Sequence, residues 1–437
     1  MHILMPAFIS LLLQAQEPVL PLNLRKSIEI AAAPDGSIRL EIATEAIAQA
    51  EARRQQARAA LLPHVDGSVS YQNLTRNLRA FGIEFPTIPG LRFSTFAGPF
   101  SIFDARATAS QSVFDLSAMR RYQAAKTAAD AMKLEGDSAR HQVSDQVARA
   151  YLAALRAEAH LESAKANLEL ARAVERLAEA QRKAGTGTAI EVTRAGVQVA
   201  AERGRLTTAE SERNRAHLQL LRAMDLKLET RLELTDKLQY AAPPPVSLEQ
   251  ATELAEQGRA DYMAQRRREQ AAELSYRATS FERLPSATAF ADYGSIGGAV
   301  NDSRATRTVG VNVRIPLFDG GRREARRAES GSQLRVEQIR TKDLRQQIEL
   351  EVRLSFDNLR SAEAQVATAE EGLTLAQREM DQAERRYKAG VANSLEITDA
   401  QTRLTRARET RVNALFAHNL ARLDLGSALG AVERYLP

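Results

Sequence analysis

Residues 182–195 read RKAGTGTAIEVTRA and residues 387–400 read YKAGVANSLEITDA, so the chain carries nearly the same pattern twice. Gly185 aligns with Gly390 at an offset of 205 residues (390 less 185). Apolar residues on both sides of the pattern keep the same offset: Val147 with Val352, Leu168 with Leu373, Leu220 with Leu425. A constant offset over this distance indicates a duplicated structural unit, so we expect the function to belong to a pseudo-symmetric assembly.

The duplication predicts two structural repeats, residues 16–230 and 247–437, joined by a Pro-rich connector at residues 231–246. Ahead of them, an apolar run from Ile3 to Leu13 is followed by QAQEP. This resembles a secretory signal, so residues 1–15 are predicted to be a signal peptide, with an N-terminal tail as the alternative. No run approaches the ~20 apolar residues of a membrane-spanning helix.

The composition excludes several classes of function. The chain has 437 residues, a net charge of +5 and no Cys or Trp. Its Arg and Glu residues are interspersed as on solvated helix faces, so no nucleic-acid partner is expected. Without Cys there is no disulfide or thiolate site, and the six His have no ligand spacing, so no metal or cofactor is expected. No Ser/His/Asp set or phosphate loop occurs, so the chain is predicted not to be an enzyme.

Each repeat contains one very long helix with an apolar seam. In the first repeat the helix is predicted from about Ser117 to Ala184, roughly 100 Å at 1.5 Å per residue. Its seam steps alternate between four and three residues, the spacing of a coiled coil. The seam residues at matching positions of the two repeats are Val143, Val147, Ala154, Leu161 and Leu168, and Ile348, Val352, Leu359, Val366 and Leu373. After the Gly-containing turns, helices are predicted to about Leu226 and Leu429, and two further helices at residues 38–62 and 247–284.

Four stretches alternate apolar and polar residues, which predicts four strands: residues 65–72, 103–114, 287–293 and 309–315. Residues 73–101 and 294–307 are expected to be loops. Each strand would have one apolar face and one polar face. Four strands cannot close a barrel, and open sheet edges are not tolerated in lipid. The chain is therefore predicted to supply a fraction of a shared barrel, with about twelve strands from three copies; the alternative is a soluble coiled-coil scaffold whose alternating stretches are loops.

Three motifs resemble the TolC-type outer-membrane efflux proteins (outer membrane factors): PLFDGG at residues 316–321, YKAG at 387–390 followed by LEITDAQ at 395–401, and LGSALG at 425–430. The resemblance implies a mainly α fold with a small β part. Long coiled-coil hairpins would form an α-barrel through the periplasm, and the four strands would join a trimeric twelve-stranded β-barrel in the outer membrane. It also implies a passive duct of a tripartite efflux or type I secretion system, exporting drugs, metals, small molecules or proteins. A soluble periplasmic coiled-coil scaffold remains the alternative.

The resemblance also implies partners: a homotrimer, a periplasmic adaptor (membrane fusion) protein, an inner-membrane transporter of the RND, ABC or MFS type, and outer-membrane lipid. The helix turns would form the periplasmic end. There, Glu396 and Asp399 match acidic gate positions, and Glu191 matches an acidic position after the first turn. Two other gate positions, Ile190 and Ala392, depart from the polar or basic residues of the family. The adaptor would dock on the turns, at Gly185, Thr186, Gly390 and Val391.

In the last strand, alternation decides which side chains would face lipid. We expect Val309, Val311, Val313 and Ile315 to face lipid, with Asn312 and Arg314 toward the lumen.

Overall fold

The computed structural model describes residues 19–33, 36–83, 94–242 and 246–435. The predicted signal peptide and the three prolines of the connector lie outside these residues. The chain divides into two compact units. The first comprises Met1–Glu45, Leu134–Met263 and Asp343–Pro437, and the second Ala46–Lys133 and Ala264–Lys342.

The long helices have the lengths that the duplication predicts. Helix α3 spans Leu116–Lys183 (68 residues) and α7 spans Arg322–Lys388 (67 residues). Each is followed by a helix of 35 residues, α4 at Ala189–Ala223 and α8 at Ser394–Ala428. The predicted boundaries are confirmed to within a few residues. Among the described helices, none combines the length and the apolar character needed to cross a membrane.

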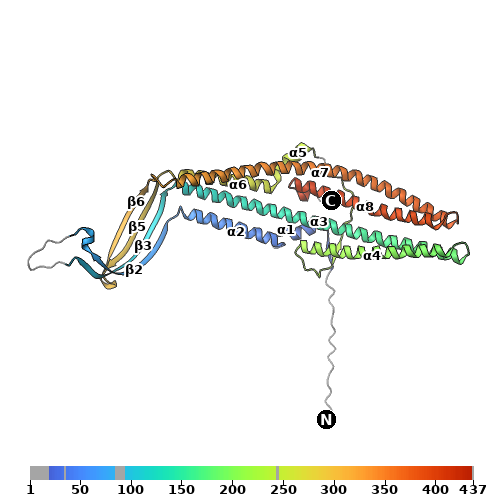
Figure 1. The fold of residues 1–437 in the computed structure, drawn as a ribbon, viewed down its shortest axis with the longest axis horizontal. Helices are drawn as coiled ribbons and strands as arrows, with labels where there is room; N and C mark the ends of the chain where they lie inside the picture. The colour runs from blue at the N-terminus through green and yellow to red at the C-terminus, as the bar shows by residue number, and fades with distance from the viewer. Residues whose placement is uncertain (1–18, 34–35, 84–93, 243–245, 436–437) are drawn as a thin grey trace, which may run out of the picture. The chain divides into compact units, whose positions relative to one another are not determined.

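Within the first unit, Figure 1 draws α7 above α8 and α3 above α4, and near the turns α4 also contacts α8 and α3 contacts α7. One core joins α3 to α4 and includes Val147 and Leu220, which are fully buried. A second core joins α7 to α8 around Val352 and Leu425. Leu423 of α8 belongs to the core of α3, so α8 and α3 are neighbours. The seams therefore bury most of the residues that the heptad spacing selected; Leu161 and Leu373 are partly buried.

All four long helices end in the same hydrogen-bonded turn. A residue with positive φ follows each helix: Gly185 (75°), Asp225 (55°), Gly390 (72°) and Gly430 (69°). The N–H of the following residue then donates to the carbonyl five residues earlier. This is the Schellman arrangement, which satisfies the last carbonyls of a helix. The four bonds run from Thr186 to Gln181, Leu226 to Leu221, Val391 to Arg386 and Ala431 to Gly426. Three of the four left-handed positions are Gly, and the fourth is Asp225.

The second unit contains an antiparallel sheet in the order β2-β3-β5-β6 (Figure 1). The strands are β2 His64–Asn77, β3 Phe96–Phe114, β5 Ser286–Gly297 and β6 Ser303–Arg314. The four predicted strands are confirmed, but the predicted loops at 73–101 and 294–307 were too long. Strand pairing continues into both of them, because residues such as Gly297, Ser303 and Ser101 hydrogen-bond through their backbones although their side chains show no alternation.

The register places apolar side chains on one face of this sheet. Val309, Ala291, Ala109 and Val65 lie opposite one another across the four strands. Val309 is 80% exposed in the single chain. On the other face, Arg106 of β3 donates hydrogen bonds to Asp104 and to Asp292 of β5, at 2.7 and 3.2 Å. The predicted division into an apolar and a polar face is therefore present in the strand register.

Two sequence predictions were wrong. The described residues contain six strands rather than four, because β1 (Leu20–Leu22) pairs in parallel with β4 (Leu232–Leu234) in the first unit. Three-residue strands are too short to show alternation. The single helix expected at 247–284 is two helices, α5 (Leu248–Gly258) and α6 (Ala260–Phe281), because Arg259 between them has an extended backbone.

Shorter elements complete the described chain. They are helices α1 (Leu24–Ala32) and α2 (Ile38–Ala59), and the 3₁₀ turns η1 (Leu78–Phe81), η2 (Val300–Asp302) and η3 (Val432–Tyr435). The helix predicted at 38–62 is thus confirmed as α2.

The connector is fastened to the helices by partly buried polar and aromatic contacts. Asp236 accepts hydrogen bonds from the Tyr151 hydroxyl (2.9 Å) and from the Leu24 backbone N–H (2.8 Å). The Tyr240 ring contacts the His418 ring, with centroids 4.7 Å apart and planes tilted by 36°. Burial, and then the charge of Arg422, lower the pKa of His418 to about 4, so this imidazole is neutral at pH 7. The connector is therefore part of the helical core in this region.

Replacing Asp225 with Gly should stabilise the protein by roughly 0.5–1 kcal/mol, because a residue with a Cβ is strained at positive φ. Gly430→Asp is the matched control at the equivalent position of the second repeat. There a Cβ would lie 2.9 Å from the Gly258 carbonyl oxygen, so we expect destabilisation. Denaturant midpoints of the two variants test this; an unchanged or lower midpoint for Asp225→Gly would contradict it.

Candidate functional site at the helix turns

The first turn, between α3 and α4, is closed by its own backbone and by one carboxylate. Gly185 donates to the Arg182 carbonyl (3.1 Å) and Thr186 to the Gln181 carbonyl (2.9 Å). Glu191, in the first turn of α4, accepts a hydrogen bond from the backbone N–H of Thr188 at 2.8 Å. A carboxylate at this position is favoured by the free N–H groups of the helix start. Glu191 therefore has a structural role here.

The second turn, between α7 and α8, repeats this construction. Gly390 donates to the Tyr387 carbonyl (3.1 Å), and Val391 to the Arg386 carbonyl (3.1 Å). Asn393 begins α8, and its side-chain oxygen accepts from the N–H groups of Leu395 and Glu396, at 3.1 Å each. The start of α8 is thus capped by Asn393, which leaves the Glu396 carboxylate available for another partner.

That partner is Arg386, in the last turn of α7. The Arg386 Nε donates to Glu396 Oε1 at 2.8 Å across the turn, with the two side chains 56% and 41% exposed. Asp399 lies one turn further along α8, is exposed, and makes no hydrogen bond or ion pair with any residue that the structure describes. The two predicted gate acids therefore differ, since one is neutralised within its own chain and the other is free.

The structure brings the two turns together. The Gln181 side chain donates to the Tyr387 backbone carbonyl at 2.9 Å, which links the end of α3 to the end of α7. Tyr387 is buried, and burial, followed by the nearby Glu191 carboxylate, raises the pKa of its hydroxyl. Beneath the turns, one core includes residues of all four long helices: Ala178, Ala195, Met380, Tyr387 and Ile397. The acidic residues of both turns thus lie at the same end of one packed cluster.

The predicted docking residues lie on the open surface of the turns. Gly185, Thr186, Gly390 and Val391 are all exposed, and a Cβ built on either glycine would meet no atom of the described chain within 4 Å. The constraint on both glycines is therefore their positive φ, not close approach of another segment.

Sequence reasoning missed Arg386 and Gln181, which build this site, and it found Tyr387 only as part of the YKAG motif, without predicting its contact with Gln181. The pattern did contain a signal for Arg386, because an Arg ten residues before Glu396, across a short turn, is placed to face it. Gln181 could not be found in this way, since its partner is a backbone carbonyl 206 residues away. Among the described residues, no group of His, Asp and Glu side chains has the arrangement of a metal site. The turns therefore present charged and apolar surface to a partner or to passing solutes.

The sequence signature of the Outer membrane efflux protein family matches residues 36–225 and 251–431. The chain belongs to this family. The two matched segments correspond to the two helix–strand–helix parts of the chain on either side of the connector. The family consists of transport channels and not of enzymes.

Two relatives are also described as outer-membrane proteins of efflux or export. The pyoverdine export outer membrane protein OpmQ of Pseudomonas putida is 26% identical over 414 residues, covering 93% of this chain and 86% of that protein. The outer membrane efflux protein BepC of Brucella suis is 28% identical over 120 residues, which are 28% of this chain but only 26% of BepC. BepC therefore supports the resemblance over a short segment, and OpmQ over nearly the whole length.

Solved structures share the fold. The outer membrane channel CmeC of Campylobacter jejuni superposes with a TM-score of 0.79 over 94% of this chain and 86% of that one, at 16% identity. VceC of Vibrio cholerae gives a TM-score of 0.77 over 93% and 96% of the two chains, at 20% identity. The predicted fold class, long helical barrel parts with a β portion, is confirmed.

Family membership also confirms the predicted location and role. The protein is an outer-membrane channel of an efflux system and extends into the periplasm. Channels of this family form trimers and work with an adaptor and an inner-membrane transporter. The soluble scaffold, the alternative left open by the sequence, finds no support.

Proposed function

We propose that three copies of this chain form one passive export duct, with a twelve-stranded barrel to which each copy contributes β2, β3, β5 and β6. The observation that carries this proposal is the open sheet. The outer edges of β2 and β6 have no partner strand within the described chain, and one face carries exposed Val65, Val69, Val309, Val311 and Val313. Lipid would cover the apolar face, and neighbouring copies would pair the edges.

The two structural repeats, residues 16–230 and 247–437, remain part of this proposal. The near-identical lengths of α3 and α7, and the equal lengths of α4 and α8, support it. The connector at 231–246 would join the repeats. A signal peptide at residues 1–15 would direct the chain out of the cytoplasm.

Transport through the duct would depend on an adaptor and on an inner-membrane transporter of the RND, ABC or MFS type. The duct itself would bind no cofactor and perform no catalytic step. The exposed turns at Gly185, Thr186, Gly390 and Val391 are proposed as the adaptor-docking surface, because their backbones are fixed by the Schellman bonds while their outer side is open.

Glu396, Asp399 and Glu191 are proposed to form the periplasmic gate. Three copies would bring these carboxylates to the same end of the helical barrel, where they would attract cations and resist anions. Arg386 reduces the charge that Glu396 contributes, so Asp399 and Glu191, which make no ion pair among the described residues, would carry most of the free negative charge.

A charge on the proposed lipid face should block barrel assembly. Val311→Arg should cost about 2–4 kcal/mol near the membrane centre, whereas Asn312→Arg, on the opposite face of the same strand, should be mild. The measurement is the amount of detergent-resistant trimer in isolated outer membranes. Equal amounts for the two variants would show that the face assignment is wrong.

Removing the Arg386 charge should make the channel more cation-selective. Arg386→Gln would free the Glu396 carboxylate in each copy, and the exposed ion pair contributes at most about 1 kcal/mol to folding, so assembly should be unaffected. Reversal potentials in planar bilayers under a salt gradient give the selectivity. Arg385→Gln is the matched control, since the neighbouring Arg385 is exposed and makes no ion pair within the described residues. The proposed gate is refuted if both variants behave alike.

Changing the backbone at a turn should stop export without stopping assembly. Gly390→Val strains a position with φ of 72° and should disturb the docking surface. Gly204→Val, at an exposed helical position with open space, is the control. For Gly390→Val alone we expect wild-type trimer levels but no export and no adaptor cross-linking. Retained export would show that this turn is not part of the docking surface.

A further inference from the structure

The sheet face that carries Val65 and Val309, the valine face, changes in chemistry along the strands. From the helix-joined end outward, β6 places on this face Val313, Val311, Val309, Arg307, Ala305 and Ser303. The residues of β5 paired with them are Ala287, Ala289, Ala291, Tyr293, Ser295 and Gly297. The face is therefore aliphatic as far as Val309 and Ala291, and the change comes at the neighbouring pair Arg307 and Tyr293.

The other two strands change in the same way. On the valine face β2 places Val65, Gly67, Val69, Tyr71 and Asn73, and β3 places Ala109, Ala107, Ala105, Phe103 and Ser101. The change comes here at the pair Tyr71 and Phe103. Phe103 pairs with Gly297 of β5, four residues beyond Tyr293 (297 less 293), so the boundary crosses the strands obliquely. A membrane surface crosses the tilted strands of a barrel in this way, and aromatic residues gather at such surfaces.

The position of Arg307 fits the outer edge of an apolar band. In the proposed barrel, the helix-joined ends of the strands would lie toward the periplasm. Eight residues (315 less 307) separate Arg307 from Ile315, which is predicted to face lipid. At ~3.4 Å per residue and a tilt of roughly 40° they rise about 20 Å, against an apolar band about 25 Å tall. A charge is tolerated best at this edge, and the long Arg side chain can extend outward to the headgroups.

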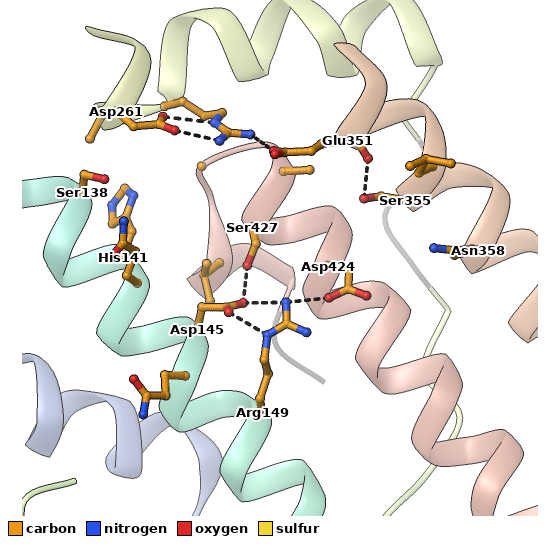
Figure 2. Close-up of a pocket in the computed structure, with 18 of the residues that line it drawn as sticks. Ser138, His141, Asp145, Arg149, Asp261, Glu351, Ser355, Asn358, Asp424 and Ser427 are labelled. Carbon is orange, nitrogen blue, oxygen red and sulfur yellow. Dashed lines mark hydrogen bonds and ion pairs between the residues drawn. The ribbon is translucent and has the colours of Figure 1, made fainter. Parts of the chain in front are cut away.

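Two other arginines are satisfied within the chain. In the cavity of about 660 Å³ that Figure 2 shows, Arg149 of α3 binds Asp145 (2.7 Å) and Asp424 of α8 (2.6 Å), and the Ser427 hydroxyl donates to Asp145. This ionic network joins the two repeats. On the other face of the sheet, Arg106 is paired with two aspartates. These cations need no partner from outside.

Arg307 differs from them. Its side chain is exposed, and its guanidinium makes no hydrogen bond or ion pair with a described residue. Within the regular register, from Val65–Asn73 of β2 across to β6, it is the only charged residue on the valine face. In the proposed trimer β2 of the next copy would lie beside β6, and β2 brings no acid to this face either. An anion that meets Arg307 must therefore come from the membrane.

We propose that Arg307 binds a phosphate of lipid A, the lipid anchor of the lipopolysaccharide in the outer leaflet of the outer membrane. A guanidinium binds phosphate through paired, charge-assisted hydrogen bonds. The phosphate monoesters of lipid A carry more negative charge than the phosphodiester of a phospholipid, which favours lipid A. Tyr293, directly across from Arg307, would place its ring against the same lipid. This inference rests on the trimer proposed above, which would have one such contact on each β6.

Native mass spectra of the purified trimer with added lipid A test the proposal. Wild-type trimers should bind one lipid A for each copy. Arg307→Gln should lower the bound fraction roughly tenfold, because hydrogen bonds to a charged group are lost, and Arg307→Lys should keep most of the binding. The matched control is Arg304→Gln, which changes an exposed arginine three residues away on the opposite face and should bind like the wild type.

Two comparison lipids identify the ligand. Lipid A stripped of its phosphates, and phosphatidylglycerol, should bind the wild type more weakly than lipid A does. Equal binding of lipid A by wild type and Arg307→Gln, or an equal loss in Arg304→Gln, would overturn the proposal. Phosphatidylglycerol that binds as tightly as lipid A would also overturn it. A wild-type protein that is monomeric in mild detergent would instead overturn the duct on which the site depends.

Discussion

Unpaired backbone groups at the edges of the sheet are the constraint on which the rest of this protein depends. A strand edge in lipid leaves N–H and C=O groups without water or partner, at several kcal/mol for each group. A chain with a four-stranded sheet would therefore have to share its barrel, as proposed above. In the proposed trimer, the helices that continue from the strands would also close a ring with helices of other copies.

The two proposed repeats would supply the ring with nearly equal parts, and these parts differ at particular positions. The four long helices end in the same turn, yet one of these turns has Asp225 where the others have Gly. Near the end of α8 the second repeat presents Asp424 and Ser427 to the charged pair on α3, whereas near the end of α4 the first repeat has Gln219 and Arg222 beside an exposed leucine. Helix length is thus kept between the repeats, while contact chemistry has diverged.

The sequence alone was sufficient for the long helices, the four barrel strands and the position of the turns, because heptad spacing and alternation extend over many residues. It was not sufficient for the β1–β4 pair or for the break at Arg259, since three residues show no period and the break is a single residue with an extended backbone. Among the site residues, the position of Glu396 was evident but its neutralisation by Arg386 was not. The sequence shows which residues are acidic, and only the folded turn shows which acids have partners.

The ionic network at Asp145 and Arg149 also bears on the order of events during biogenesis. Its members all belong to one polypeptide, so this contact can form as soon as a single chain folds. The outer edges of β2 and β6 have no such partner among the described residues, and in the trimer proposed above they would stay exposed until other copies arrive. A newly exported chain is therefore at its most aggregation-prone between folding and assembly, and escorting factors in the periplasm would have to shield these surfaces during that interval.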